Sequence, residues 1–145
     1  PERDSQKIQE VALPSKGVNL KFVNFPGHQG TEILNNVYLV FTPEGYSFSQ
    51  TGDQSNQEDF GWIDRVGDSN RVDVLMPNCW TSNPARLTKG FRPKLVITGH
   101  ENEMGHTIDH REPFWLNSPR WKEVLTPRIQ MAWGEKFHYL PRQFK

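Results

Sequence analysis

The order of apolar and polar residues predicts a series of short strands separated by turns. Residues 18–25 alternate at first and are apolar on both sides toward their end, which is typical of a strand that enters a core. Residues 36–42 and 46–50 flank a Pro-Glu-Gly turn and predict a hairpin. Residues 72–76 and 95–97 are short apolar runs with the composition of buried strands. Most of the predicted sheet therefore lies between residues 18 and 97.

Helix signals lie between and after these strands. Residues 59–66 and 82–89 are predicted to form short helices, the second with a proline in its first turn. Residues 109–117 are predicted to be helical, and residues 137–140 to form a last short strand. Strands alternate with helices after the hairpin, which favours a sheet layered with helices. We therefore expect one domain, residues 1–145, of the α+β class: a mixed β-sheet with flanking helices.

The charge, the cysteine content and the lack of long apolar runs argue against several classes of function. The 145 residues carry 17 basic and 17 acidic side chains, and a net charge of zero argues against a nucleic-acid or anionic-membrane surface. The single cysteine, Cys79, excludes an internal disulfide and is interpreted as a buried inert thiol. No apolar run reaches the roughly 20 residues of a membrane span, and no signal peptide precedes the first strand. We therefore expect a cytoplasmic protein without a transmembrane segment, while a targeting signal upstream of Pro1 would lie outside this sequence.

Three predicted strands run into a glycine followed by a side chain that can bind a metal. The sequence F-P-G-H ends in His28, Q-T-G-D in Asp53 and I-T-G-H in His100. Glycine at these positions lets the backbone turn sharply and approach a ligand. Open α/β sheets bind ligands at the carboxyl ends of their strands, and imidazole with carboxylate suits zinc, iron or manganese. We expect these three residues to converge just beyond the strand ends and form a metal site.

Each of these residues also has an ordinary structural interpretation. His28 could be a turn residue, Asp53 could form an Asx-turn or cap the following helix, and His100 could cap the next segment. His138, beside Tyr139, is interpreted as structural. The agreement of three separate strand ends favours the metal site over three unrelated turns.

The segment after His100 contains further candidates. Glu101, His106 and His110 follow within ten residues, and the two histidines share one face if the segment is helical. We expect Glu101, His106 and His110 to orient the ligands by hydrogen bonds or to contact the substrate. The histidines could also replace a missing ligand if the loop folds back.

The ordered set P-G-H at 26–28, T-G-D at 51–53 and V-I-T-G-H at 96–100 resembles the later ligand motifs of the metallo-β-lactamase-fold hydrolases. The resemblance is closest to the lactonase-like and phospholipase-like members. It implies that His28 binds one metal, His100 binds a second, and Asp53 bridges the two as the catalytic carboxylate. Zinc, or another divalent transition metal such as iron or manganese, would then activate water to hydrolyse a small-molecule substrate.

The sequence departs from this family in one respect. The motif His-x-His-x-Asp-His is absent, since no histidine precedes His28. The resemblance therefore implies half of an αββα sandwich, its C-terminal half, without the ligands that the N-terminal half supplies. The metal could then be absent from this chain, and the isolated chain would be weakly active or inactive.

Two interpretations remain open. The chain is either the C-terminal half of a metal-dependent hydrolase or a non-catalytic half-domain that serves as a binding or oligomerisation module. The residues encoded upstream of Pro1 would distinguish them, since a His-x-His-x-Asp-His motif there favours the hydrolase. Both interpretations leave one sheet face uncovered, which predicts self-association or association with the missing N-terminal half.

Overall fold

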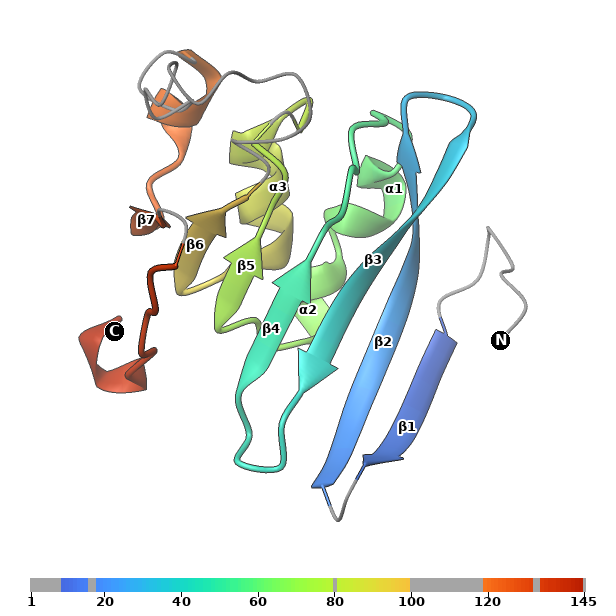
Figure 1. The fold of residues 1–145 in the computed structure, drawn as a ribbon. Coiled ribbons are helices and arrows are strands. Elements are labelled where there is room, and N and C mark those ends of the chain that lie inside the picture. Colours follow the sequence, from blue (N-terminus) through green and yellow to red (C-terminus); the bar gives the residue numbers. More distant parts are fainter. Residues whose placement is uncertain (1–8, 16–17, 80, 100–118, 132–133, 145) are drawn as a thin grey trace.

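The computed structural model describes residues 9–15, 18–79, 81–99, 119–131 and 134–144. They form one sheet of seven strands, whose spatial order from β1 to β7 is the order of the sequence (Figure 1). The strands are β1 (Gln9–Ser15), β2 (Val18–Gln29), β3 (Ile33–Phe41), β4 (Ser47–Gln50), β5 (Val74–Met76), β6 (Leu95–Thr98) and β7 (Arg128–Gln130). The first four strands pair antiparallel, and β4 to β7 pair parallel. The expected mixed sheet is confirmed.

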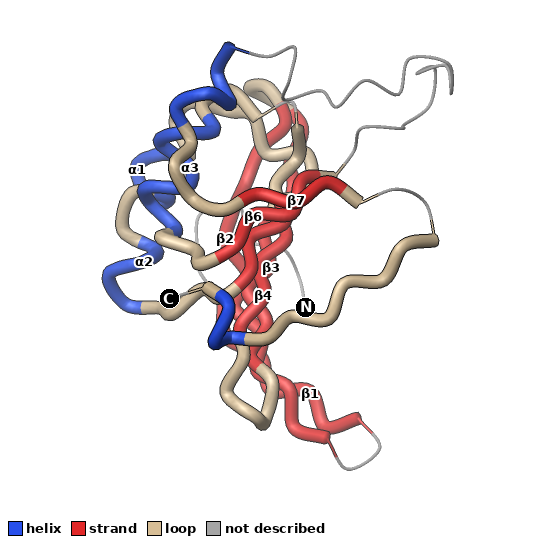
Figure 2. The backbone as a smooth tube through the Cα atoms, turned by 90° about the vertical axis from the view of Figure 1, so that its left-hand side faces the viewer, coloured by secondary structure: helices blue, strands red, loops and turns tan. Residues whose placement is uncertain are grey.

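Short helices connect the parallel strands. They are α1 (Phe60–Ile63), α2 (Val66–Ser69) and α3 (Pro84–Phe91), with the 3₁₀ helices η1 (Pro119–Glu123) and η2 (Pro141–Gln143) later in the chain. Figure 2 shows that α1, α2 and α3 all lie on the same side of the sheet. The chain thus belongs to the α+β class, as expected. Among the described residues, no helix has the length and apolar character needed to cross a membrane.

The core lies between the sheet and these helices. Strand residues Val23, Phe25, Val37 and Leu39 pack against helix residues, and all are 3% exposed or less. The helix residues of this cluster are Phe60, Ile63, Val66, Leu87 and Phe91. Because burying one such side chain stabilises a fold by about 1.5–3 kcal/mol, this cluster fixes the helices to one face of the sheet.

The opposite face of the sheet carries a row of apolar side chains. The strand register aligns Phe22, Val40, Phe48, Val74 and Leu95 across β2 to β6. Since alternate residues of a strand point to opposite faces, this row faces away from the helix-side cluster. In Figure 2 the helices α1, α2 and α3 lie away from this side, and part of the segment 134–144 runs along it.

The segment 134–144 is attached to the sheet through aromatic contacts and one hydrogen bond. The Tyr139 ring stacks on Phe144 at 5.6 Å between centroids and meets Tyr46 edge-on at 6.2 Å. The Tyr139 hydroxyl donates to Oδ1 of the fully buried Asp73, 3.2 Å away. Burial, together with the Asp73 carboxylate, raises the pKa of Tyr139 to about 12.

Three sequence predictions need correction. Residues 59–66 form two separate short helices instead of one, because the chain turns at Asp64 and Arg65. Residues 137–140 do not form a strand, and the last strand of the described chain is β7, whose three residues are too few to show a pattern. The helix predicted at 109–117 lies outside the described residues.

The third correction concerns β2, which was expected to stop at Pro26-Gly27. The strand continues to Gln29, and His28 lies directly opposite Leu34 on β3. Pro26 lies opposite Asn36 of β3 in this ladder, and the described residues of β1 pair with β2 as far as Asn24. His28 is therefore part of a strand and does not follow one.

Candidate functional site

The positions that precede the three candidate ligands lie near one edge of the sheet. Gly27 is opposite Asn35 on β3, and Gly99 forms a parallel bridge with Asn78. Between them, the loop that begins at Thr51 is held to the end of β5, because the Asn78 amide donates to Thr51 Oγ1 at 3.1 Å. The carboxyl ends of β2, β4, β5 and β6 thus lie on the same side of the sheet, where the sequence predicted the site, and β3, β4 and β5 stand between β2 and β6.

His28 is held by a buried carboxylate. The Nδ1 atom of its imidazole and Asp59 Oδ1 are 2.8 Å apart, and the His28 backbone amide donates to Asp59 Oδ2 at 2.8 Å. Asp59 is only 3% exposed. If the carboxylate is ionised it can only accept, so Nδ1 is the donor of this bond, and in the neutral imidazole the lone pair of Nε2 is then available to a ligand.

The Asp59 carboxylate belongs to a buried polar network. Gln54, which is fully buried, donates from Nε2 to Asp59 Oδ2 at 3.2 Å and to the Asn56 carbonyl at 2.8 Å. Its Oε1 accepts a hydrogen bond from the Thr81 hydroxyl at 3.2 Å. This network ties the His28 imidazole to the loops after β4 and β5, so that the ring orientation is fixed by the fold.

Asp53 lies three residues beyond the end of β4 and is half-buried. Gly52 before it has φ of 53°, a left-handed conformation that favours glycine. The loop then returns to β2, where the amides of Ser55 and Asn56 donate to the His28 carbonyl at 2.9 and 3.2 Å. The fold therefore brings the loop that carries Asp53 against the strand that carries His28.

The remaining predicted site residues fall elsewhere. His100, Glu101, His106 and His110 lie outside the described residues, although Gly99 places the start of their segment at this edge. In the part of the chain that the structure describes, no group of three or more His, Cys, Asp or Glu side chains could hold a metal ion. His138 is exposed on the segment 134–144, away from this edge, and Cys79 is buried.

Sequence reasoning missed the residues that support His28. Asp59 was interpreted only as the start of a helix, yet its side chain makes no capping hydrogen bond and turns to His28 instead. The available signal was the density of amide and hydroxyl side chains in Q-S-N-Q directly after Asp53. A loop with so many polar side chains could be buried only if those side chains formed hydrogen bonds within the protein, as Gln54 does.

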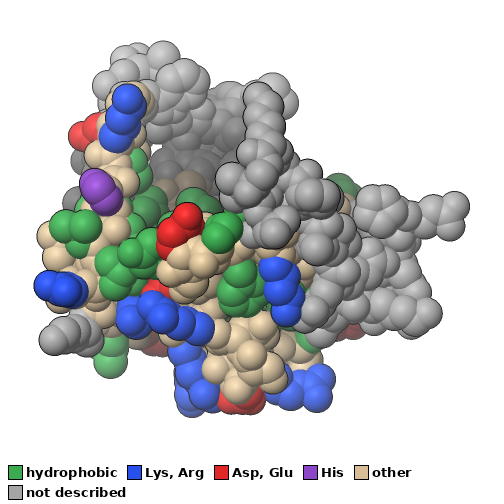
Figure 3. Space-filling view, turned by 90° about the horizontal axis from the view of Figure 1, so that it is seen from below, with side chains coloured by type: hydrophobic (Ala, Val, Ile, Leu, Met, Phe, Trp, Pro, Cys, Tyr) green, Lys and Arg blue, Asp and Glu red, His purple; other side chains and the backbone are tan. Residues whose placement is uncertain are grey.

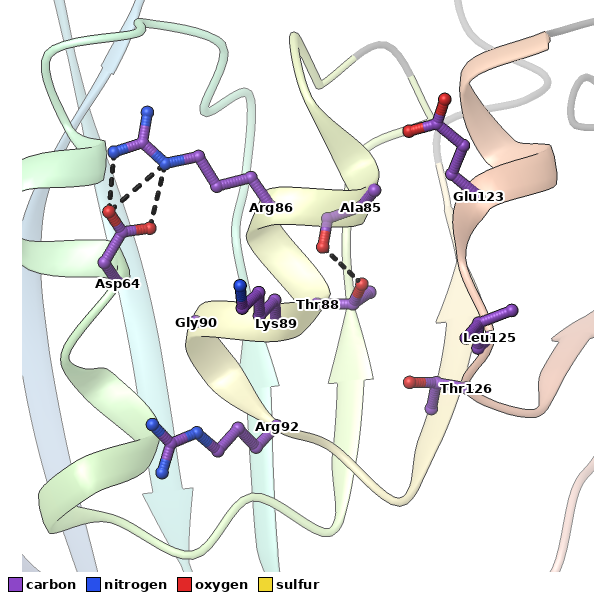
Figure 4. Close-up of a pocket in the computed structure, with 10 residues that line it drawn as sticks. All are labelled: Asp64, Ala85, Arg86, Thr88, Lys89, Gly90, Arg92, Glu123, Leu125 and Thr126. Atoms are coloured by element: carbon purple, nitrogen blue, oxygen red, sulfur yellow. Dashed lines mark hydrogen bonds and ion pairs between the residues drawn. The ribbon is translucent and has the colours of Figure 1, made fainter.

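A surface hollow of about 920 Å³ lies elsewhere, on the outer helical face (Figure 4). Arg86 of α3 forms a two-pronged ion pair with Asp64, and its guanidinium lowers the pKa of that carboxyl. Lys89 and Arg92 of α3 line the same hollow, with Leu125 on its other side. Neither His28 nor Asp53 lines it, and we do not assign it to the candidate site.

Basic side chains of the described residues are scattered over the face seen in Figure 3. The view from below shows Lys and Arg scattered among apolar and acidic side chains of the described chain (Figure 3). Several are paired with carboxylates, as Arg71 is with Asp73 and Arg92 with Asp68. This distribution agrees with the net charge of zero and offers no extended basic surface there.

Comparison with known proteins adds no further assignment. No protein-family model matches the sequence, and no curated protein sequence matches it. Any functional conclusion therefore has to come from the motifs and from the geometry around His28.

Proposed function

We propose that this chain is the C-terminal half of a metal-dependent hydrolase of the metallo-β-lactamase fold, with His28, Asp53 and His100 as metal ligands. The observation that carries the proposal is the pair of His28 and Asp59. Histidines that bind metals usually donate their second ring N–H to a carboxylate, which fixes the ring and raises its basicity. A histidine that served only as a turn residue would not require a hydrogen bond to a carboxylate that is 3% exposed.

The donor set fits zinc, iron or manganese. The Nε2 atom of His28 and the Asp53 carboxylate are the nitrogen and oxygen donors that such ions accept. The third donor would be His100, which follows Gly99 at the same edge of the sheet. Glu101, His106 and His110, which come next in the sequence, are proposed to orient these ligands or contact the substrate.

The chain's own residues would bind and orient the ion. A bound divalent metal lowers the pKa of a coordinated water and so supplies hydroxide near neutral pH. His28 would be held ready by Asp59 and Gln54, so that little reorganisation accompanies binding. Asp53 would contribute negative charge from the loop that is bonded to the His28 carbonyl.

A second candidate function is a non-catalytic binding or oligomerisation half-domain. It is favoured by the apolar side chains on the sheet face away from the helices, where Phe22, Val40 and Phe48 are half-buried and Tyr38 is 40% exposed. Apolar side chains aligned across several strands are typical of a surface that packs against another sheet. The two candidates are compatible if the face binds the other half of a hydrolase.

Hydrolysis assays distinguish the two candidates. The chain, supplied with Zn²⁺ or Mn²⁺, would be tested on lactones and phosphodiesters beside Asp53→Asn and the exposed His138→Gln as a control. We expect slow hydrolysis that chelation abolishes, that Asp53→Asn loses and that His138→Gln keeps. Hydrolysis that is indifferent to chelation and to Asp53→Asn would contradict the hydrolase and favour the binding module.

A further inference from the structure

The two glycines that precede His28 and Asp53 flank one asparagine side chain. Asn35 on β3 lies directly opposite Gly27, and its Nδ2 is 3.2 Å from the point where a Cβ on Gly27 would stand. A Cβ on Gly52 would overlap Asn35 Oδ1. A side chain at Gly52 would collide with the Asn35 carboxamide, whereas a Cβ at Gly27 would meet first Val37 Cγ2, at 2.9 Å, and then Asn35 Nδ2.

The same carboxamide holds the loop that carries Asp53. Asn35 Nδ2 donates to the Thr51 carbonyl at 2.7 Å, and Asn35 Oδ1 accepts from the Asp53 amide at 3.3 Å. These two hydrogen bonds span Gly52, whose φ of 53° makes the turn possible. One side chain thus fixes the backbone on both sides of the turn that delivers Asp53.

Asn35 is also tied to the strand that carries His28. It is adjacent to Leu34, the residue opposite His28 in the register of β2 and β3. A displacement of Asn35 would therefore move the loop of Asp53 relative to the strand of His28.

We propose that Asn35 is the positioning residue of the candidate site and sets the separation and orientation of His28 and Asp53. This role rests on the proposed function, because the relative position of His28 and Asp53 matters only if both side chains bind the same ligand. Asn35 itself is not proposed to touch metal or substrate. Its effect is transmitted through Thr51 and the turn at Gly52.

The first test measures position without metal. NMR spectra of the full chain would follow the His28 ring and the Asp53 backbone amide in Asn35→Ala and in Asn36→Ala. Asn36 is a matched control, since it is the next residue and its Oδ1 has no hydrogen-bond partner among the described residues. We expect both resonances to shift in Asn35→Ala and to stay in place in Asn36→Ala. Equal spectra of the two variants would overturn the inference.

The second test measures ligation with Co²⁺ as the probe, by its visible absorption spectrum. We expect Asn35→Ala to weaken Co²⁺ binding about 10- to 100-fold and to change the spectrum, as loss of an outer hydrogen-bond partner does in metal sites. Unchanged affinity and spectrum, with the wild-type chain binding Co²⁺, would overturn the inference.

Two further outcomes of these tests also bear on the proposal. If the resonances of His28 and Asp53 shift but the wild-type chain binds no Co²⁺, the positioning by Asn35 is supported and the proposed function is contradicted. If Asn35→Ala fails to fold, Asn35→Asp replaces it, with Asn36→Asp as its control. Asn35→Asp keeps the acceptor for the Asp53 amide and loses the donor to Thr51, so the same shifts are expected.

Discussion

Asp59→Asn is the substitution that tests the role of the carboxylate beside His28 most directly. Oδ2 of Asp59 accepts from two groups that can only donate, the His28 amide and the Gln54 side chain. Oδ1 faces the His28 Nδ1 atom, which can donate or accept. The asparagine oxygen must therefore take the Oδ2 position, and its NH₂ group must face Nδ1.

This arrangement forces a change in the imidazole of His28. With an NH₂ donor opposite it, Nδ1 must become the acceptor, and the ring proton must move to Nε2. All three hydrogen bonds of residue 59 can then still form. We expect a loss of stability of only about 1–3 kcal/mol, because bonds to a charged acceptor are exchanged for bonds to a neutral amide. Asp59→Ala leaves three donors without a partner and should cost more.

The assay combines urea unfolding with two-bond ¹H–¹⁵N NMR spectra, which distinguish the two neutral forms of the imidazole. The account predicts that His28 carries its proton on Nδ1 in the wild-type chain and on Nε2 in Asp59→Asn. It also predicts that the variant loses metal binding, because Nε2 no longer offers a lone pair. A His28 ring that keeps the Nδ1 proton in Asp59→Asn would refute this reasoning.

Three further predictions follow from other contacts. Gly52→Ala should destabilise the chain in urea unfolding by more than Gly30→Ala. Both positions have positive φ, which costs a residue with a Cβ about 1–2 kcal/mol, but of these two only the Cβ at residue 52 meets a neighbour, Asn35. Equal losses of stability in the two variants would exclude that collision. The pKa of Tyr139 is raised from 10.0 to about 12, so its contribution to stability should be complete below pH 10 and lost between pH 10 and 12. Tyr139→Phe should remove this pH-dependent loss of stability. Parallel curves of stability against pH for the two proteins would count against the hydrogen bond from Tyr139 to Asp73. The sheet face away from the helices, on which Tyr38 is 40% exposed, should make the chain self-associate in light scattering, with less association in Tyr38→Lys. A compact 16.9 kDa monomer at high concentration would argue that the face is not an interface.

Periodicity was enough to predict the strands whose apolar residues enter the core. Val23, Val37 and Leu75 stand in runs whose composition already indicates burial, and the structure confirms it. The continuation of β2 past Pro26 was not predictable in this way, because it depends on pairing with β3, where Pro26 lies opposite Asn36. The same applies to β7, whose position is set by pairing with β6 and not by its own three residues.

The site was predictable only in part, for a similar reason. The motifs that end in His28 and Asp53 stand out because glycine precedes each of them, and the structure places their backbones at one edge. The groups that orient them, Asp59 and Asn35, are distant in sequence and carry no motif of their own. Their roles arise from the path of the loop after β4, which local composition does not encode.

The measurement that tests the central claim most directly is Zn²⁺ binding by equilibrium dialysis. The wild-type chain would be compared with His28→Gln, Asp53→Asn and the control His138→Gln, whose side chain is exposed and remote from the site. The account predicts weak but saturable binding by the wild-type chain and by His138→Gln, and at least tenfold weaker binding by the other two variants. Wild-type chain that binds no Zn²⁺, or equal binding by all four proteins, would contradict a metal site at His28 and Asp53.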